Sequence, residues 1–424
     1  MKQYEEYKDS GIQWWGNIPD NWCLSKAKHM FSLVNENVSS PDLPKVALEN
    51  IESWTGRYTE TANDFMGEGV EFHPNDILFG KLRPYLAKVY KAEFKGQSVG
   101  DIYVFRGNEN QDPGFLKYLF LSYPFISVVD GSTYGAKMPR ANWDFISQMI
   151  LPCPPLSEQQ SIASYLDYKV GQIDTVISEK EKMLEDLKAY RSAVISEAVT
   201  KGLDKNVEMK DSGIEWIGMI PKHWEIVKMS WIYPNIGSGT TPDTNNIDYY
   251  SEDGYNWLQT GDLNDGYITA TSKHITEKAV RERGMRIYPQ GSLVIAMYGA
   301  TIGKVGLLQI DTTTNQACCV LPPNAKMSNV YTKFVLQAAK DVLLQLSNGG
   351  GQPNISQSVI KSLLLPMPDI TEQAIISQYL QNKFEHVDTV LAELISEISD
   401  LKSYKSSLIT EAVTGKIDLR DWKK

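Results

Sequence analysis

The sequence predicts an α+β protein in which two globular domains alternate with two long helices. The helices are expected to pair as an antiparallel coiled coil, with pseudo-two-fold symmetry and a cyclic arrangement. Three observations support this fold class: a proline-led segment that opens a long helical stretch occurs twice, a tryptophan-containing segment occurs twice, and the interiors between these segments differ from each other. We expect four parts, at 1–157, 158–207, 208–364 and 365–424, and 424 residues are enough for each globular part to bury its own core.

The proline-led segment covers residues 151–166 and returns at 365–380, an offset of 214 residues that holds without a gap for the rest of the helical stretch. Proline cannot sit inside a helix but is common just before one. We expect Ser157 and Thr371 to be the N-caps, each followed by a glutamate in the first turn. No proline follows in either copy for roughly forty residues, which corresponds to about 60 Å of helix.

Apolar residues in both helical stretches are spaced alternately four and three residues apart. A stripe this narrow, continued over several heptads, requires a partner helix, so we predict that the two helices pair with each other. The alternative is that each helix packs on its own globular domain. The stripe, called the seam below, consists of Leu166, Val170, Ile173, Ile177, Lys180, Leu184, Leu187, Arg191, Val194 and Ala198 in the first helix and of Leu380, Phe384, Val387, Leu391, Leu394, Ile398, Leu401, Lys405, Leu408 and Ala412 in the second.

The tryptophan segment covers residues 8–22 and returns at 210–224, an offset of 202 residues, so the second half carries 12 more residues between its two repeated segments. Two half-chains related by duplication are the simplest explanation. When the second half is aligned on the first, it stops where the first half continues into its next tryptophan segment. The missing segment is the one found at the N-terminus. We therefore predict that the two chain termini lie close together.

The two interiors, at about 23–150 and 225–364, mix β-rich runs with turn residues, and we expect an α+β domain in each. Helical pieces are predicted at 114–129 and 328–346, and a short helix is expected before each proline-led segment. Strands are predicted at 76–80, 88–90 and 102–105 in the first interior and at 292–296, 304–308 and 317–321 in the second.

Composition is that of an ordinary globular protein, with 42% hydrophobic and 22% charged residues, but the formal net charge is −10. That sign is wrong for a simple nucleic-acid binder, so DNA contact would need local basic patches or a basic partner. The four cysteines include no CxxC pair, which indicates reduced thiols rather than a disulfide framework or a zinc site. A polar N-terminal stretch and the lack of a long apolar run predict a cytoplasmic protein without a signal peptide or membrane span.

No convincing catalytic motif is present, so we predict a non-catalytic chain with no metal and no cofactor of its own. Residues 299–305 have three residues between their glycines and a valine after the lysine, where a P-loop needs four and a serine or threonine. Gly237-Ser-Gly lacks the third glycine of a dinucleotide-binding fingerprint. There is no Asn-Pro-Pro-aromatic or Asp-Pro-Pro-aromatic tetrapeptide of an adenine methyltransferase, and the five histidines show no metal-ligand spacing.

Residues suited to DNA recognition lie in the same two loops of each interior. Residues 131–140 align at the 214 offset with 345–354, which places Arg140 opposite Asn354. Arginine contacts guanine and asparagine or glutamine contacts adenine in a bidentate manner. The alternative for each residue alone is a solvated loop position. The predicted DNA-binding residues are Lys81, Arg83, Tyr85, Lys88, Tyr134, Lys137, Arg140, Tyr298, Thr301, Lys304, Gln352 and Asn354.

Repeated aromatic and Glu-Gln positions outside the interiors have two interpretations. They can pack each interior against the helices, or they can bind a partner protein, because aromatic anchors also mark interfaces. The residues predicted to bind a partner are Trp14, Trp22, Trp216, Trp224, Glu158, Gln159, Glu372 and Gln373.

The order of these motifs resembles that of the specificity subunit of type I restriction–modification systems. The resemblance rests on the two tryptophan segments and the two Leu-Pro-x-Pro-x-x-x-Glu-Gln helices, and it covers essentially the whole chain. It implies two target recognition domains, each reading one half of a bipartite, asymmetric DNA sequence, with a helix pair that fixes their separation. It also implies two methyltransferase subunits, which supply S-adenosylmethionine and methylate adenine at N6, and two restriction subunits, which use ATP and magnesium.

Two other classes of function stay open at this point. One is a coiled-coil scaffold that joins protein partners without reading DNA. The other is an enzyme that modifies nucleic acid alone, against which the missing methyltransferase tetrapeptide argues.

Overall fold

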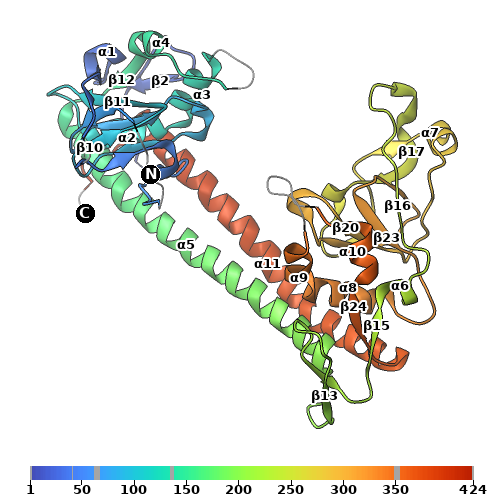
Figure 1. Ribbon diagram of the computed structural model, residues 1–424. Helices are drawn as coiled ribbons and strands as arrows, with labels where there is room; N and C mark the ends of the chain where they lie inside the picture. The colour runs from blue at the N-terminus through green and yellow to red at the C-terminus, as the bar shows by residue number, and fades with distance from the viewer. Residues whose placement is uncertain (1, 41, 62–66, 134–137, 348–353, 423–424) are drawn as a thin grey trace. The chain divides into compact units, whose positions relative to one another are not determined.

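The computed structural model describes residues 2–40, 42–61, 67–133, 138–347 and 354–422 (Figure 1). The chain forms two compact units: unit 1 holds Met1–Lys182 with Leu394–Lys424, and unit 2 holds Met183–Glu393. Each unit contains one globular domain and one part of each long helix. None of the described helices is long and apolar enough to cross a membrane.

Both predicted long helices are present, α5 at Leu156–Lys201 and α11 at Ile370–Val413. Seam side chains near both ends of each helix are buried, as predicted, whereas several near the middle are half-buried. The buried seam residues are Leu166, Val170, Ile173, Ile177, Ala198, Leu380, Phe384, Leu394, Ile398, Lys405, Leu408 and Ala412.

Each long helix begins before the residue predicted as its N-cap, so the N-cap predictions for Ser157 and Thr371 are wrong. At α5 the Pro155 carbonyl accepts backbone N–H groups of the first turn at 2.9 and 3.0 Å. At α11 the Asp369 carboxylate accepts the N–H groups of Thr371 and Glu372 at 2.8 and 2.9 Å. An ionised carboxylate at the positive helix end is a stronger cap than a hydroxyl, which explains the earlier start of α11.

Within unit 1 the two helices run antiparallel, as predicted. Asp174 of α5 pairs with Lys405 of α11 at 2.8 Å. Lys180 lies further along α5, yet it pairs with Glu397, which lies earlier on α11, at 2.6 Å. The order of contacts is therefore opposite on the two helices.

Unit 2 repeats this arrangement. Arg191 of α5 pairs with Asp388 of α11 at 3.0 Å, and its guanidinium lies 5.0 Å from the centre of the Phe384 ring. The end of α5, at Gly202, lies beside Glu372 at the start of α11. Arg191 and Asp388 are each offset by 214 residues from a member of the buried pair in unit 1, so the two ion pairs are equivalent in the repeat.

A second cation, Arg57, pairs with the buried Asp174 carboxylate in unit 1. Arg57 of the globular domain lies 2.9 Å from Asp174, and its side chain is 51% exposed, whereas those of Asp174 and Lys405 are 8% and 9% exposed. The corresponding region of unit 2 holds Lys333, which is buried over the ring of Tyr267. Burial, reinforced by the nearby Arg191 guanidinium, lowers the pKa of Lys333 to about 8.

The globular domain of unit 1 is built from two four-stranded sheets, in the orders β4-β11-β8-β9 and β5-β7-β10-β6. The three predicted strands are confirmed as β8, β9 and β11. The predicted helix at 114–129 is two helices, because Ser122 adopts an extended backbone between them. The strands are β4 Phe31–Val34, β5 Asn37–Val38, β6 Lys45–Val46, β7 Gly69–Phe72, β8 Ile77–Gly80, β9 Val89–Lys91, β10 Gly96–Ser98 and β11 Ile102–Gly107, and the helices are α1 Ala27–Met30, α2 Pro113–Leu121, α3 Tyr123–Gly131 and α4 Trp143–Gln148.

The domain of unit 2 contains a five-stranded sheet, β16-β23-β20-β21-β18, and a three-stranded sheet, β19-β17-β22. The predicted strands are confirmed as β20, β21 and β23, and the predicted helix at 328–346 is again two helices, which separate at Ala339. The strands are β16 Gly237–Ser238, β17 Tyr250–Leu258, β18 Tyr267–Ile268, β19 His274–Ile275, β20 Leu293–Ala296, β21 Val305–Leu308, β22 Thr313–Thr314 and β23 Cys318–Leu321, and the helices are α6 Met229–Ile232, α7 Glu277–Glu282, α8 Asn329–Ala338, α9 Lys340–Gln345 and α10 Gln357–Ser362.

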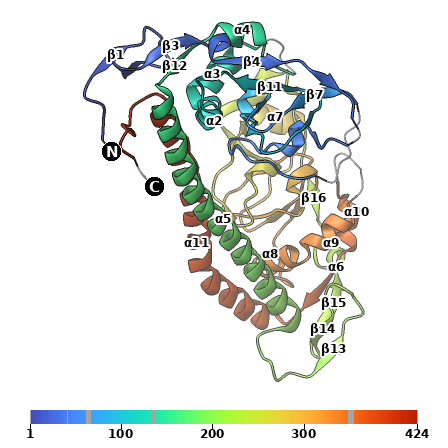
Figure 2. The same cartoon turned by 90° about the vertical axis from the view of Figure 1, so that its left-hand side faces the viewer.

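Each domain is attached to its long helix through a short antiparallel ladder. In unit 1, β3 (Cys23–Lys26) pairs with β12 (Ile150–Cys153), and Figure 2 shows these strands above the start of α5. In unit 2, β15 (Glu225–Lys228) pairs with β24 (Leu364–Met367). The tryptophan segments form two further hairpins, of β1 (Tyr7–Asp9) with β2 (Asn17–Pro19) and of β13 (Met209–Asp211) with β14 (Met219–Pro221).

The chain termini lie together in unit 1, as predicted (Figure 1). The Lys2 ammonium lies 2.9 Å from Asp421 and 3.4 Å from Asp418, and the Asp418 backbone N–H donates to the Lys2 carbonyl. Hydrogen bonds from the Arg420 guanidinium hold the pKa of Asp418 at about 2.

Replacement of Lys405 by methionine tests the buried pair. Loss of the ammonium should destabilise the protein by about 3 kcal/mol, the low end for a broken buried ion pair, because Arg57 still faces the carboxylate. Lys402→Met is the matched control: Lys402 pairs with Glu181 across the same helices, but both side chains are about half exposed, so the cost should stay below about 1 kcal/mol. Urea unfolding measures the loss of stability in both variants. Equal losses would contradict the assignment of Lys405 to a buried ion pair.

Candidate nucleic-acid interface and the frame that holds it

Four predicted recognition residues of unit 1 lie on the turn between β8 and β9: Lys81, Arg83, Tyr85 and Lys88. A short 3-10 helix, Pro84–Leu86, forms this turn, and Arg83 before it adopts a left-handed backbone with φ 52°. The Arg83 N–H donates to the Pro139 carbonyl at 2.8 Å, and Leu82 forms an isolated β-bridge with Arg140. The structure therefore brings together the two loops that the sequence singled out.

Charged side chains from these two loops share the carboxylate of Asp101. Arg140 donates twice to Asp101, at 2.9 and 3.2 Å, which raises the pKa of the guanidinium, and the Lys81 ammonium lies 3.7 Å from the same carboxylate. Arg83 and Tyr85 are exposed. Lys88 instead points to the backbone beneath the turn, where its ammonium donates to the Leu48 carbonyl at 2.6 Å.

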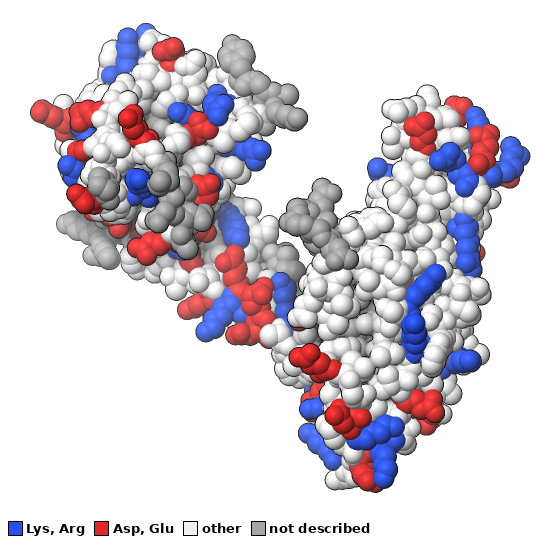
Figure 3. Space-filling model, viewed as in Figure 1, with Lys and Arg blue, Asp and Glu red and all other residues white. Residues whose placement is uncertain are grey.

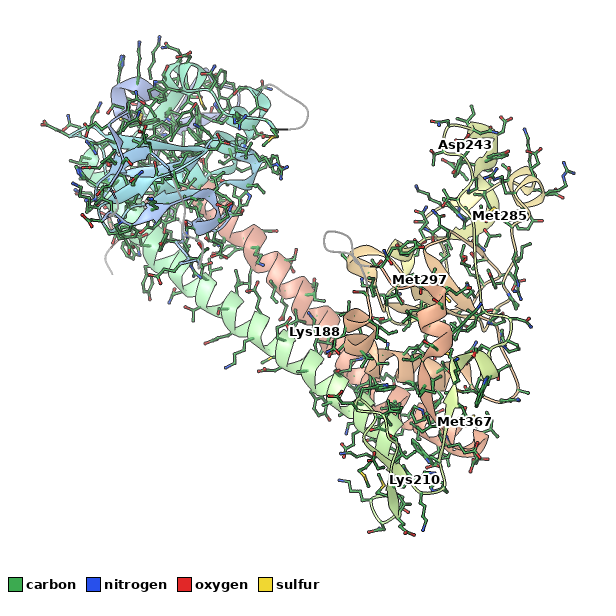
Figure 4. The ribbon with its side chains drawn as sticks, viewed as in Figure 1. Lys188, Lys210, Asp243, Met285, Met297 and Met367 are labelled. Carbon is green, nitrogen blue, oxygen red and sulfur yellow. The ribbon has the colours of Figure 1, made fainter. Side chains whose placement is uncertain are left out.

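Unit 2 places the corresponding segments in the same relation. The turn between β20 and β21 contains the short 3-10 helix Gly299–Thr301, and it begins beside Met297, labelled in Figure 4. Tyr298 forms an isolated β-bridge with Asn354, and the N–H of the next residue, Ile355, donates to the Met297 carbonyl at 2.8 Å. The Thr301 hydroxyl donates to the Tyr298 carbonyl at 3.0 Å.

The two turns match in position but differ in chemistry. Unit 1 presents guanidinium and ammonium groups around Asp101. Unit 2 presents an exposed phenol and an exposed amide, those of Tyr298 and Asn354, together with half-buried Thr301 and Lys304. The predictions for Tyr134, Lys137 and Gln352 lie outside the described residues. DNA binding by the other nine residues stays a prediction.

Sequence reasoning missed two residues that support the turn of unit 1. The Trp54 indole donates to the Tyr85 carbonyl at 3.1 Å, and its backbone N–H donates to Ala87 at 3.2 Å. Trp54 has a left-handed backbone with φ 61°. Asp101 was the other omission. An acidic residue just before a predicted strand, facing a predicted cationic turn, was the one signal that could have identified it.

The predicted partner-binding residues form internal contacts that join the repeated segments. In unit 1 the Glu158 carboxylate accepts three hydrogen bonds, from the Trp22 indole at 2.7 Å, from Asn21 at 2.5 Å and from the Tyr4 hydroxyl at 3.1 Å. Burial, together with the charge of Glu158, raises the pKa of Tyr4. We call the contact of this tryptophan with the glutamate the clamp.

Unit 2 has the same clamp with one different donor. The Trp224 indole donates to Glu372 at 2.9 Å, and the His223 ring lies 2.9 Å from the same oxygen. Trp22 and Trp224 are buried. In both units a carboxylate in the first turn of a long helix is therefore fixed by the tryptophan segment.

The glutamine that follows each clamp glutamate ties the long helix to the globular domain. Gln159 is buried, accepts the N–H of Asp112, which caps α2, at 2.9 Å and donates to Pro154 at 2.9 Å. Gln373 is equally buried and accepts the N–H of Ser328, before α8, at 2.8 Å. Each side chain therefore connects two helices that lie far apart in the sequence.

A glycine at the end of the other long helix completes each clamp. Gly415, with φ +73°, lies so close to the tryptophan segment that an added Cβ would be 2.3 Å from Pro19 and 3.2 Å from Trp22. Gly202, with φ +72°, takes the same position, where an added Cβ would be 3.3 Å from Trp224. The tryptophan segments, helix starts and helix ends together form what we call the frame.

The two remaining partner-binding candidates, Trp14 and Trp216, differ in their exposure to solvent. Trp14 is 42% exposed, and Trp216 is partly buried against the core of unit 2. Trp15, which the sequence analysis did not single out, is buried and donates to the Ile150 carbonyl at 2.7 Å. Partner binding by the eight candidates stays a prediction.

Comparison with known proteins gives the family. Residues 221–399 match the family model of the type I restriction modification DNA specificity domain. The EcoKI specificity subunit of Escherichia coli K12 is 22% identical over 95% of this chain and 90% of its own length, and the EcoBI specificity subunit of E. coli is 22% identical over 82% and 75%. Residues 221–399 thus carry the DNA specificity domain of this family, and nearly the whole chain is similar to type I specificity subunits.

Further relatives agree. The MjaIX specificity subunit of Methanocaldococcus jannaschii is 32% identical over 39% of this chain and 38% of that protein. A chain from a solved structure on complex assembly and conformational transition of the type I R-M system superposes with a TM-score of 0.67 at 17% identity, over 94% of this chain and 99% of that one. This likeness confirms the predicted fold.

The family also decides between classes of function. Specificity subunits are the non-catalytic DNA-recognition components of their systems, so the prediction of a non-catalytic chain is confirmed and the stand-alone modifying enzyme is excluded. Among the described residues no group of three or more His, Cys, Asp or Glu side chains is arranged to hold a metal ion.

Replacement of Trp22 by phenylalanine tests the clamp of unit 1. The ring still fills its site, but buried Glu158 loses one charge-assisted donor, so the protein should lose about 2 kcal/mol of stability. Trp14→Phe, at an exposed position of the same segment, should cost no more than about 0.5 kcal/mol. Denaturant unfolding followed by circular dichroism gives both values, and an unaffected Trp22→Phe variant would refute the role of the indole N–H.

Proposed function

We propose that the two globular domains of this specificity subunit are target recognition domains, and that each reads one half of a bipartite, asymmetric double-stranded DNA sequence. One observation carries the proposal: each domain joins the same two segments, a strand turn and the segment around Arg140 or Asn354, but with different side chains. A duplicated frame that presents two unlike surfaces fits a target with two unlike halves.

The side chains on the two turns suit different base edges. In unit 1, Arg83 and Arg140 can each donate two hydrogen bonds to guanine O6 and N7, and Asp101 holds the Arg140 guanidinium in a fixed orientation. In unit 2, the Asn354 amide suits adenine N6 and N7. The exposed rings of Tyr85 and Tyr298, at 46% and 45%, occupy the same turns and can pack against the DNA.

Charge distribution supports a shared interface with partner subunits. The chain carries a net charge of −10, and on the face seen in Figure 3 basic and acidic side chains are interspersed rather than gathered into one basic surface. Phosphate contacts sufficient for tight binding then have to come in part from partners. These are two methyltransferase subunits, with S-adenosylmethionine for adenine N6 methylation, and two restriction subunits, with ATP and magnesium. The complex would work in the cytoplasm, where the host DNA is.

The two long helices would determine the distance between the half-sites. Each is continuous for more than forty residues and is bonded to a tryptophan segment at its start. A helix advances by about 1.5 Å per residue, so its length converts directly into separation along DNA.

Sequencing of host DNA with detection of modified bases, with and without this gene, tests the function. A gapped two-part motif that carries N6-methyladenine should be present in the parent and absent from the deletion strain. Asn354→Ala and Arg140→Ala should each relax or abolish one half of the motif and leave the other half unchanged. A motif that persists in the deletion strain, or altered halves on both sides in a single variant, would overturn the assignment. The scaffold alternative predicts no gene-dependent motif in the presence of the partners.

Insertion of four residues at matched positions in the middle of α5 and α11 tests the spacing role. The helices lengthen by about 6 Å, so the gap between the half-sites should grow by roughly two base pairs while both half-sites keep their sequences. The matched control inserts four residues at the exposed turn 204–206 after α5, outside the helix pair, and should leave the gap unchanged. The same sequencing assay reads both variants, and changed half-sites in the helix variant would refute the spacing role.

A further inference from the structure

We propose that Cys23 and Cys153 form a dithiol site that a peroxide oxidises to a disulfide. The two residues are directly opposite each other in the ladder of β3 and β12. Side chains of directly opposite residues lie on the same face of an antiparallel pair, with Cα atoms about 4.5–5.5 Å apart, which is within the span of a disulfide. The Cys23 sulfur lies 3.1 Å from the Cys153 carbonyl oxygen, so its side chain is turned across the ladder toward its partner.

Exposure determines which thiol reacts first. Cys23 is exposed and Cys153 is half-buried. Burial raises the pKa of Cys153, whose sulfur lies 3.5 Å from the Gln111 side-chain amide. The thiolate is the nucleophile in thiol oxidation, so Cys23 is the site of attack and Cys153 is the resolving thiol beside it.

The reaction balances with a peroxide as the only oxidant. The Cys23 thiolate attacks one peroxide oxygen, the O–O bond breaks, and Cys23 becomes a sulfenic acid as the first water forms. The Cys153 sulfur then attacks the Cys23 sulfur, the S–O bond breaks, and the hydroxyl leaves as a second water with the Cys153 proton. Two thiols and one hydrogen peroxide thus give one disulfide and two waters.

The other two cysteines provide an internal control. Cys318 and Cys319 are adjacent in β23 and fully buried. Burial raises the pKa of both thiols, that of Cys319 to about 12. Buried thiols without an accessible thiolate are inert, so these two should stay reduced in the folded protein.

The pair sits where the domain of unit 1 joins the frame. Cys23 follows the clamp tryptophan, and Cys153 lies in the Leu-Pro-Cys-Pro segment before α5. A disulfide here covalently joins the two chain ends of the domain and restricts the unfolded chain of unit 1. At the same ladder position unit 2 has Glu225 opposite Met367, so oxidation acts on one half of a symmetric frame.

Mass spectrometry of the full chain tests the site. The reduced protein is treated with hydrogen peroxide, its remaining thiols are alkylated, and it is digested without reduction. A cross-linked peptide pair that contains Cys23 and Cys153, lighter by two hydrogens and lost on treatment with dithiothreitol, is expected, with Cys318 and Cys319 found alkylated only after denaturation. Cys23→Ser and Cys153→Ser should each abolish the cross-link. In the oxidised wild type the thermal midpoint of unfolding should rise by about 5 °C or more, and neither serine variant should show this rise.

A second variant tests whether the register of the ladder is sufficient for the disulfide to form. Glu225→Cys with Met367→Cys, in a chain that also carries Cys23→Ser and Cys153→Ser, should form the equivalent cross-link in unit 2, because the register is the same. Oxidation of Cys23 to a sulfonic acid, or into a disulfide between two chains, while Cys153 stays a thiol would overturn the proposal.

Discussion

The rest of the structure depends on the hydrogen bond from a buried indole to a glutamate in the first turn of each long helix. A carboxylate there is favoured by the positive end of the helix dipole, and its bond to a donor is charge-assisted. Because Trp22 and Trp224 come from a different part of the chain, the bond fixes a helix start against a distant hairpin. The neighbouring glutamine then attaches the globular domain, and a glycine lets the end of the other helix approach.

Repetition made much of this fold predictable from the sequence. The same spacing of apolar residues in two copies identified the helices and their seam, and the unequal ends of the two repeats placed the termini together. The N-caps were misplaced because Pro155 and Asp369, each two residues before the predicted cap, satisfy the first N–H groups. The break at Ser122 has a local cause that the prediction overlooked, because Pro124 lies in the first turn of α3 and cannot sit inside a continuous helix. No proline or glycine marks the break at Ala339.

The candidate site was predictable in outline but not in its contacts. Alignment of the halves identified the two loops that meet in each domain, because equivalent positions of a duplicated fold have equivalent neighbours. The pairing of Arg140 with Asp101 joins residues that lie 39 positions apart, and no local sequence pattern predicts it. The duplication kept the backbone geometry but changed the side chains. The seam cation is lysine in one pair and arginine in the other, and the clamp glutamate is bonded by Tyr4 and Asn21 in one unit and by His223 in the other.

The short ladders of β3 with β12 and of β15 with β24 have a consequence for how such a gene can change. Each globular domain leaves the frame through two strands that lie next to each other, so its first and last residues are neighbours in space although more than a hundred residues separate them in sequence. A stretch of coding sequence between these two points can therefore be replaced by recombination without moving any frame residue. The adjacency of the two strands in each ladder thus makes each globular domain a unit that can be exchanged by itself.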